Sequence, residues 1–330
     1  MTAPQFSIII PCYNAAPFLP RLIASLCSQT LHECEFIFVN DGSPDNTMEI
    51  LSKFARQDNR VKIIDKPNEG VSVARNVALD SAQGEFVYIL DADDWMEPTW
   101  CEDMYRLVNE DGIDILIFNF YKVYEDKKVY VDLGIQEGVY TQTAFLSAIP
   151  HFPLAHMLYR RSAISSLRFI PDVRVGEVFT FFVGALARAR KVRVTKQCFW
   201  NYYHNTTSAT QAPNIQADLT IVKALSSIDA YAAQFPTHLT QYPSFVTSVC
   251  RLLNSFAFNK YVKVGASLRT MQVMIDRVYG VRMVRDYLAL CAKYTPMTAP
   301  RYYYLQGLLH APRLCYLLLR TLFRLPCLRR

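Results

Sequence analysis

Several patterns that identify common protein classes are missing from this sequence. Its nine cysteines are odd in number and none stands in a C-x-x-C pair, so neither a disulfide framework nor a zinc site is predicted and a reducing compartment is expected. No run of 18 or more apolar residues occurs, so no segment is predicted to span a membrane. The N-terminal residues lack a basic start followed by an apolar core and are not interpreted as a signal peptide. A cytoplasmic location is predicted.

Glycine-rich nucleotide motifs are also missing. Neither G-x-G-x-x-G nor G-x-x-x-x-G-K-[ST] occurs, which argues against a Rossmann dinucleotide site and against a P-loop. Acidic residues are absent from 301–330, a segment with six arginines, whereas the whole chain has a net charge of +6. The remaining 300 residues are therefore close to neutral. This distribution excludes a globally basic nucleic-acid binder and confines any basic partner surface to the tail.

The most informative stretch is an apolar run at 86–90 that is followed at once by Asp91, Asp93 and Asp94. The run predicts a buried strand of a parallel sheet. Carboxylates gathered at the end of such a strand repel each other and are costly to desolvate, and Mg²⁺ or Mn²⁺ would relieve both costs. The alternative is a polar turn in which Asp94 caps a helix that starts near Pro98.

Strands and helices alternate through the first hundred residues, which predicts an α/β fold with a doubly wound, mainly parallel sheet. Pro11 is expected to stop the first strand, because it cannot donate a ladder hydrogen bond. The predicted strands cover 7–10, 35–39, 61–64 and 86–90, and the predicted helices cover 17–28, 48–57 and 72–82. Two further strands are predicted at 114–119 and, on an edge, at 128–133.

Polar residues follow each of the first four strands. Because parallel strands end on one edge of a sheet, these residues are expected to converge in one crevice, which predicts a nucleotide-and-metal site. Tyr13 and Asp41 suit a base and a ribose, whereas Lys66 and Arg75 either face phosphates or form solvated ion pairs. The residues at the strand ends are Asn14, Asp41, Lys66 with Asn68, and Asp91 with Asp93.

Four segments, IIIPCYN at 8–14, VNDGSPDNT at 39–47, NEGVSVARN at 68–76 and LDADDW at 90–95, resemble family 2 glycosyltransferases of the GT-A fold. The resemblance implies an inverting, metal-dependent transfer of a sugar from a UDP-sugar to a saccharide or lipid-linked saccharide, as in surface polysaccharide synthesis. It also implies Mn²⁺ or Mg²⁺ ligated by Asp93 and His204. The donor-binding residues that it implies are Pro11, Tyr13, Asn14, Asp41, Lys66, Asn68, Gly70, Arg75, Asp91 and Ala92.

The residue expected to act as the base departs from the family pattern. Gly176-Glu177-Val178 stands where the family usually has G-E-D-x-x-F, so the position of the usual aspartate is occupied by Val178. Glu177 is the first candidate for the base and Asp172 the second. The alternative for Glu177 is a carboxylate that merely complements a helix N-terminus. Residues 201–208 resemble the loop that closes over the donor, although a histidine such as His204 also occurs simply solvated in such loops.

Three regions are predicted: a nucleotide-sugar-binding half at 1–100, an acceptor-binding half with the base and the closing loop at 101–212, and a helical extension at 213–330. Within the extension, helical spacing predicts helices that pack on the catalytic module. The tail 301–330 is interpreted as an interfacial helix on the anionic inner face of the cell membrane, or else as a terminal helix docked on protein. The predicted helices cover 219–235, 242–262, 267–279 and 282–294.

The sequence is also compatible with two other functions. The missing aspartate at Val178 allows a nucleotide-sugar-binding protein that has lost catalysis. A sugar nucleotidyltransferase also uses aspartates at strand ends with magnesium, but a glycine-rich basic loop to hold a triphosphate is absent after the first strand.

Overall fold

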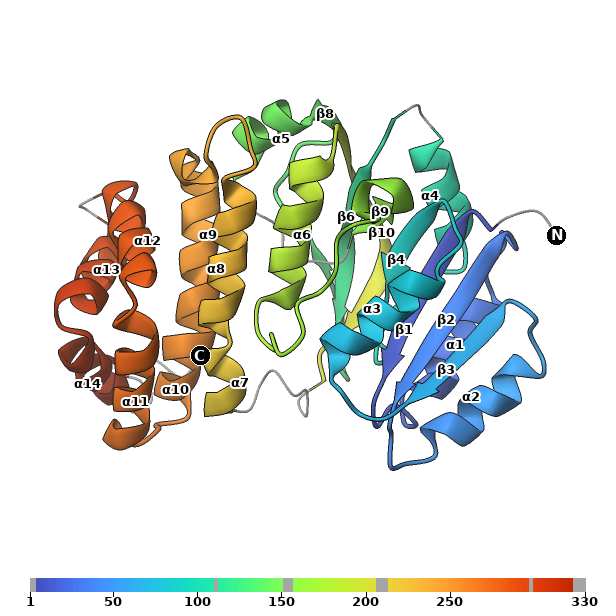
Figure 1. The fold of residues 1–330 in the computed structure, drawn as a ribbon, viewed down its shortest axis with the longest axis horizontal. Helices are drawn as coiled ribbons and strands as arrows, with labels where there is room; N and C mark the ends of the chain where they lie inside the picture. Colours follow the sequence, from blue (N-terminus) through green and yellow to red (C-terminus); the bar gives the residue numbers. More distant parts are fainter. Residues whose placement is uncertain (1–3, 110–111, 151–156, 206–212, 297–298, 323–330) are drawn as a thin grey trace. The chain divides into compact units, whose positions relative to one another are not determined.

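The structure is a computed structural model that describes residues 4–109, 112–150, 157–205, 213–296 and 299–322 (Figure 1). It divides into two compact units. The first unit consists of residues 1–172 and 181–205, and the second of residues 173–180 and 206–330.

The first unit is built on one mixed sheet, in which the described strands have the order β3-β2-β1-β4-β9-β6-β10-β5. Strands β3, β2, β1 and β4 run parallel, β9 pairs antiparallel with both β4 and β6, and β10 returns parallel to β6. The edge strands β7 and β8 pair antiparallel with β6 and β10. The strands are β1 (Phe6–Cys12), β2 (Cys34–Asp41), β3 (Val61–Lys66), β4 (Phe86–Ile89), β5 (Trp95–Met96), β6 (Ile115–Val123), β7 (Lys128–Val131), β8 (Gly138–Thr141), β9 (Leu158–Arg160) and β10 (Lys191–Tyr203).

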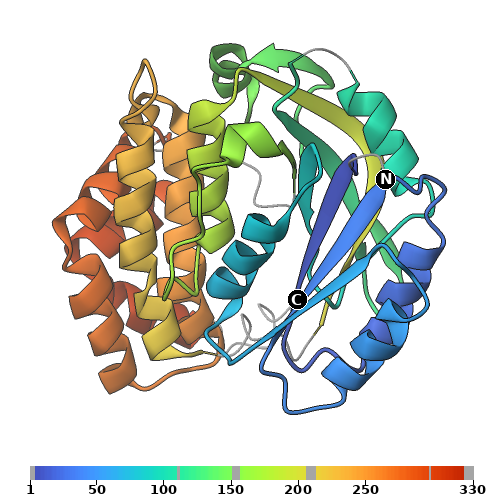
Figure 2. The same ribbon diagram turned by 45° about the vertical axis from the view of Figure 1, so that its right-hand side comes forward.

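The order of the strands reverses at β1, as the alternating pattern predicts. The chain winds outward from β1 to β3 and then returns to place β4 on the other side of β1. Right-handed crossovers consequently put α3 on the sheet face opposite to α1 and α2, as Figure 2 shows. Ligands bind at such a switch point in open α/β sheets. The helices of this unit are α1 (Leu19–Cys27), α2 (Thr47–Ala55), α3 (Val71–Ser81), α4 (Trp100–Val108), α5 (Gln142–Ala148) and the short 3₁₀ turn Arg161–Ile164.

One expectation about strands is wrong, and one strand was missed. Pro11 does not stop β1, which continues to Cys12 with Pro11 in parallel register opposite Val39. The strand β10 was not predicted, although it is the longest strand described. Its sequence shows no clean alternation, because the pairing of β10 with β6 shifts register on both sides of Cys198.

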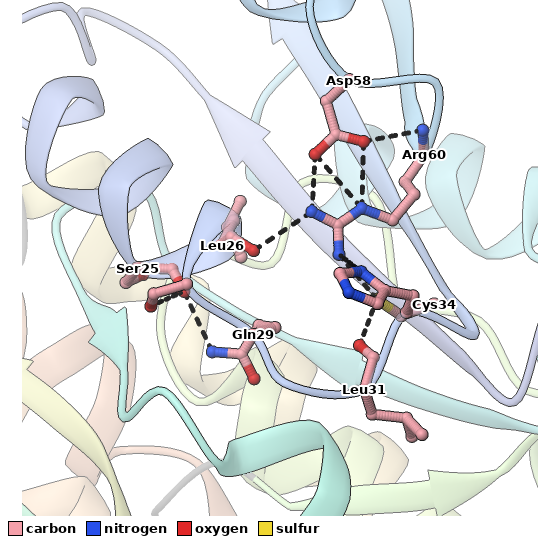
Figure 3. A network of polar contacts seen from close by, with 9 residues as sticks. Ser25, Leu26, Gln29, Leu31, Cys34, Asp58 and Arg60 are labelled. Carbon is pink, nitrogen blue, oxygen red and sulfur yellow. Dashed lines mark hydrogen bonds and ion pairs between the residues drawn. The ribbon is translucent and has the colours of Figure 1, made fainter.

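A polar network fastens the edge of this sheet (Figure 3). The guanidinium of Arg60 donates to both carboxylate oxygens of Asp58 and to the carbonyl of Leu26 at the end of α1, and it contacts the Sγ atom of Cys34 at 3.8 Å. This network joins the start of β3 to α1 and β2. Arg60 lowers the pKa of the Asp58 carboxyl, because the carboxylate form accepts its hydrogen bonds.

The second unit is helical, and α6 (Glu177–Arg188) begins in it. Asp218 is fully buried and is satisfied by Lys260 at 3.0 Å and by the hydroxyl of Tyr261 at 2.8 Å. The predicted helices of this region form, with two π-helical turns at Ser255–Asn259 and Ile275–Tyr279. The helices are α7 (Ile215–Leu219), α8 (Ile221–Ala232), α9 (Pro243–Asn254), α10 (Lys260–Lys263), α11 (Leu268–Met274), α12 (Arg282–Lys293), α13 (Pro300–His310) and α14 (Pro312–Leu322), with a 3₁₀ turn at Leu239–Gln241.

The described part of the tail packs on its own unit. Leu305, Leu308 and Tyr316 are buried, and the Tyr316 hydroxyl donates to the carbonyl of Ala266. Exposed positions alternate with them, notably Arg313 and Leu314. In the described segments, no helix combines the length and the apolar character needed to cross a bilayer. Residues 323–330 of the predicted interfacial tail lie outside the described part.

Candidate active site

The three carboxylates that follow β4 lie in a tight turn before β5. The backbone amide of Asp94 donates to the carbonyl of Asp91 at 3.1 Å and closes the turn, in which Ala92 is half-buried. The Asp91 carboxylate forms a 2.9 Å ion pair with Nη2 of Arg75 on α3. The Arg75 side chain is only 4% exposed and its guanidinium also lies over the Phe169 ring. Arg75 thus forms an ion pair that is buried and not solvated.

Asp94 is not a helix cap. Its side chain is buried, and Thr99 is the residue that precedes α4. The Asp94 oxygens accept hydrogen bonds from the Trp200 indole at 3.0 Å and from the Tyr203 backbone amide at 2.8 Å, both on β10. Burial raises the pKa of Asp94 well above its usual value, and the charges of Asp91 and Asp93 add to this rise against the two hydrogen bonds. A cation at this turn would offset that repulsion.

Arg21 on α1 also supports the turn, and sequence reasoning missed it. Its Nη2 atom donates to the backbone carbonyl of Asp93 at 2.7 Å. Its guanidinium lies 3.9 Å from the Trp95 ring centre and 4.4 Å from that of Tyr203. Neither Arg21 nor Trp200 stands in a motif, because their contacts with the carboxylate turn are long-range and leave no local signal in the sequence.

The turns that follow β2 and β3 meet at Asp41. One oxygen of its carboxylate accepts from the Nζ atom of Lys66 at 2.6 Å and from the amide of Glu69 at 3.0 Å, and the other accepts from the amide of Gly70 at 2.9 Å. Lys66 therefore also forms a largely buried ion pair, with its side chain 10% exposed. Gly70 precedes α3 with φ +92°. Asp41 thus fixes the backbone of the predicted donor turn at Asn68 to Gly70.

The turn after β1 is hydrogen-bonded to the turn that follows β2, at the same edge of the sheet. The amides of Asn14, Ala15 and Ala16 donate to the side chains of Ser43, Thr47 and Asp45, respectively, at 2.9–3.2 Å. Asn14 has φ +52°, in the left-handed region that asparagine tolerates. Tyr13 is 52% exposed, so its ring is available to a ligand. The structure therefore brings together the turns that carry Tyr13, Asp41 and Asn68.

The candidate bases belong to different units. Asp172 ends the first stretch of the first unit, is exposed and has φ +64°. Glu177 begins α6 within the part assigned to the second unit, and Val178 follows it. Both Glu177 and Val178 are partly exposed.

His204 follows β10 directly. Its amide donates to the carbonyl of Val123 at 2.8 Å, and its ring lies 4.9 Å from the ring of Tyr124. Residues 206–208 of the predicted closing loop lie outside the described part. Within the described part, no group of three or more His, Cys, Asp and Glu side chains is placed to hold a metal ion. A divalent ion here would need most of its ligands from substrate and water, which is the usual manner of Mg²⁺ binding with one or two carboxylates.

Comparison with known proteins identifies the fold. The structure matches that of S. aureus TarS residues 1–349 in complex with UDP-GlcNAc with a TM-score of 0.72 at 21% identity, over 97% of this chain and 91% of that chain. It also matches the mannosyltransferase PcManGT of Pyrobaculum calidifontis in complex with GDP-Man and Mn²⁺, with a TM-score of 0.53 at 13% identity. The match to PcManGT covers 98% of this chain and 86% of that one. The first unit has the GT-A fold predicted from the motifs.

The sequence comparisons identify the family. The model of glycosyl transferase family 2 matches residues 7–168. EpsJ of Bacillus subtilis, described as an uncharacterized glycosyltransferase, is 31% identical over 220 residues, and the match spans 64% of each chain. EpsH of the same organism, a putative glycosyltransferase, is 32% identical over 223 residues, again 64% of each chain. Residues 7–168 therefore form a family 2 glycosyltransferase domain, as the four motifs predict.

Proposed function

We propose that this chain transfers a sugar from a UDP-sugar to a saccharide or lipid-linked saccharide, with inversion at the anomeric carbon. The observation that carries the proposal is the carboxylate turn after β4, where Asp91 is held by Arg75 and the buried Asp94 by β10. The turn lies on the strand next to the β1 switch point, where nucleotides bind in open α/β sheets. The family membership supports a glycosyltransferase, and the UDP-GlcNAc bound to TarS supports a UDP-linked donor.

The residues on β1, β2 and β3 suit the nucleotide. Tyr13 offers an exposed ring beside Pro11 and Asn14 for the uracil. Asp41 orders the amides that follow Asn68, so that the turn at Gly70 borders the ribose and the diphosphate. Asp91 lies closest to the sugar in this assignment, and Ala92 lies beside it. Lys66 and Arg75 act by positioning Asp41 and Asp91 through buried ion pairs.

The carboxylate turn fits a divalent ion. Asp93 is the residue we assign to Mn²⁺ or Mg²⁺, with His204 as the second protein ligand. Burial is the main reason for the raised pKa of the neighbouring Asp94, and a cation would offset the smaller contribution from the charges of Asp91 and Asp93. When bound, the ion would neutralise charge that builds on the departing diphosphate. TarS and PcManGT differ in the nucleotide named for them, so UDP and GDP are both to be tested.

The chemistry requires a base for the acceptor hydroxyl. We assign this role to Glu177, with Asp172 as the second candidate. As the carboxylate takes the hydroxyl proton, the acceptor oxygen bonds to the anomeric carbon from the face opposite the diphosphate. The bond from that carbon to the phosphate oxygen breaks, and the nucleoside diphosphate leaves with the electron pair.

The deciding experiment is a calorimetric titration of UDP and of GDP, each with and without Mn²⁺. Metal-dependent binding of UDP is expected in the wild type and in Asp286→Ala, a control at an exposed carboxylate on α12. Binding is expected to be lost in Asp93→Ala. Absence of UDP binding under every metal condition would refute the UDP assignment, and preferential binding of GDP would replace it.

Assays of sugar release then separate enzyme from binding protein. Transfer or hydrolysis of a UDP-sugar, lost in Glu177→Gln, would establish catalysis. UDP-sugar binding with neither reaction would favour the catalytically impaired protein that Val178 allows. Release of pyrophosphate from a nucleoside triphosphate and a sugar 1-phosphate would instead indicate a nucleotidyltransferase.

We also propose contact with an anionic membrane surface through the C-terminal helices. A cavity of about 820 Å³ between α12 and α13 is lined by Arg282, Arg285, Lys293 and His310, and Asp286 is its one acidic residue among the described lining. Arg313 and the 57% exposed Leu314 follow on α14. Cationic and apolar side chains in this combination suit an interface with anionic lipid.

Point substitutions are the appropriate test of this contact, since deletion after Pro300 would remove the buried Leu305 and Tyr316 and open the core of the unit. The double variant Arg313→Glu, Leu314→Ser is expected to reduce sedimentation with vesicles that contain phosphatidylglycerol. Sedimentation equal to that of the wild type would contradict the proposal.

A further inference from the structure

Two lysines are held against one tyrosine where β6 turns into β7. The Nζ atoms of Lys122 and Lys127 lie 5.1 Å and 5.2 Å from the centre of the Tyr124 ring, within the range of a cation–π contact. The amide of Tyr124 donates to the carbonyl of Lys127 at 2.8 Å, which closes the turn. The His204 ring packs 4.9 Å from the same tyrosine. Both ammonium groups are therefore placed beside the end of β10.

Within the described residues, no carboxylate neutralises the charges of these two lysines. Neither Lys122 nor Lys127 forms an ion pair with any residue in the described ranges, although Glu125 and Asp126 lie in the same turn. Their neighbour Lys128 behaves differently, since its Nζ atom forms a 2.7 Å ion pair with Glu97. Two ammonium groups on one ring repel each other, and a bound anion would relieve that repulsion.

The register of the sheet places Lys122 on the same face as Trp200, which donates to the carboxylate turn. Residues in register on neighbouring parallel strands direct their side chains to one face, and Lys122 is in register with Tyr202. Trp200 lies two residues before Tyr202 and on the same face. Its indole donates to Asp94, and its ring centre lies 4.8 Å from that of Phe120. Tyr202 is therefore in register with Lys122 and two residues from the tryptophan that donates to the carboxylate turn.

The order of the strands indicates that the two lysines lie on the acceptor side of the site and not on the nucleotide side. The turns assigned to the nucleotide follow β1, β2 and β3, on one side of β4, whereas Lys122 lies on β6, on the other side. A donor that extends from Tyr13 to Asp91 consequently has the lysines beyond its sugar. We propose that Lys122 and Lys127 bind a negatively charged group, a phosphate or a carboxylate, on the acceptor saccharide. This inference rests on the proposed transferase function.

The test uses the full chain saturated with UDP and Mg²⁺, so that the nucleotide site is already filled. Glucose, glucose 6-phosphate and glucuronate are titrated separately by calorimetry at low salt. Both anionic sugars are expected to bind more tightly than glucose, and added salt should reduce the difference. The double variant Lys122→Ala, Lys127→Ala should weaken binding of the anionic sugars about two- to thirtyfold, the range expected for two partly exposed charge contacts. A loss confined to glucose 6-phosphate identifies a phosphate, and a loss confined to glucuronate identifies a carboxylate.

A matched control removes two exposed lysines elsewhere, in Lys53→Ala, Lys263→Ala. It should retain the binding of anionic sugars, and the Lys122→Arg, Lys127→Arg variant should retain most of it. Equal binding by the test variant and this control would overturn the inference. A matching loss of affinity for UDP in the test variant would also overturn it, because the lysines would then serve the donor. Failure of the wild type to bind UDP appears before any sugar is added and concerns the proposed function itself.

Discussion

The indole nitrogen of Trp200 on β10 donates a 3.0 Å hydrogen bond to Oδ2 of Asp94, a residue 106 positions earlier in the chain. Together with the bond from the Tyr203 amide, it holds the carboxylate turn against a strand of the other half of the sheet. The side chain of Asp94 is buried, so its oxygens depend on these partners for hydrogen bonds.

Replacing Trp200 with Phe should therefore affect stability and metal-dependent nucleotide binding together. Loss of a buried donor to a carboxylate is expected to cost about 1–3 kcal/mol of unfolding free energy. UDP should also bind less tightly, because the turn that carries Asp93 loses one of its supports. Urea unfolding and UDP titration measure the two effects, with Tyr105→Phe on the surface of α4 as the control. Unchanged UDP affinity in a destabilised Trp200→Phe protein would show that the bond has no part in the site.

Gly42 is required where the turns after β2 and β3 approach each other. It has φ +66°, and a Cβ atom there would lie 2.7 Å from the backbone nitrogen of Asn68. Gly265 provides a matched control, since it has φ +62° but a Cβ atom added to it would have nothing within 4 Å. Both changes to alanine should cost about 1–2 kcal/mol for the left-handed backbone. Only Gly42→Ala should also displace Asn68 and weaken UDP binding.

Thermal unfolding and UDP titration of the two glycine variants make this comparison. Equal UDP affinity in Gly42→Ala and Gly265→Ala would mean that the turn at Asn68 does not contact the donor.

Local sequence patterns predicted the parts of the fold that are determined locally. The apolar runs of β1 to β4 and the spacing of α1 to α3 were assigned correctly, since each element is continuous and strongly patterned. The strand β10 was missed, because its register shifts interrupt the alternation and its last residues resemble a family loop. The position of the strand ends on one edge also followed from their parallel direction alone.

The side-chain partners within the site were not predictable in this way. The sequence was compatible with phosphate contacts or solvated ion pairs for Lys66 and Arg75. Only the three-dimensional arrangement shows that each forms a buried ion pair with an aspartate. Asp94 was equally consistent with a helix cap. Its actual donors lie more than a hundred residues away, a separation at which neither spacing nor propensity carries information.

Glu35 on β2 should contribute a stability that depends on pH. Burial on its own would raise the pKa of this carboxyl, but the hydrogen bonds from Lys62, Ser7 and the amide of Gln83 outweigh it, so the pKa lies below the usual value. The unfolded chain therefore binds a proton more readily than the folded one. Stability from Glu35 is complete above the unfolded pKa of about 4.3 and is lost as the pH falls through the folded pKa.

Unfolding free energy measured from pH 6 to pH 3 should consequently fall less steeply in Glu35→Gln than in the wild type. The variant should also be less stable than the wild type at pH 6, because it loses the 2.5 Å ion pair between Lys62 and Glu35. Glu33→Gln, an exposed position two residues earlier, is the control and should follow the wild-type slope. Parallel profiles for Glu35→Gln and the wild type would contradict the assigned pKa shift.

The identity of the base is tested by three substitutions around the start of α6. Glu177→Gln should lower transfer by about 100-fold or more, the usual contribution of general base catalysis, and should leave UDP affinity unchanged. Asp172→Asn should retain activity if Glu177 is the base. Val178→Asp restores the carboxylate that the family usually has there, and in a Glu177→Gln background it should recover part of the lost transfer. Initial rates with a UDP-sugar, together with UDP titrations, distinguish these outcomes. Full activity in Glu177→Gln together with loss of activity in Asp172→Asn would assign the base to Asp172. Glu177 would then only complement the N-terminus of α6, a role in which a neutral amide can replace the carboxylate without loss of the chemical step.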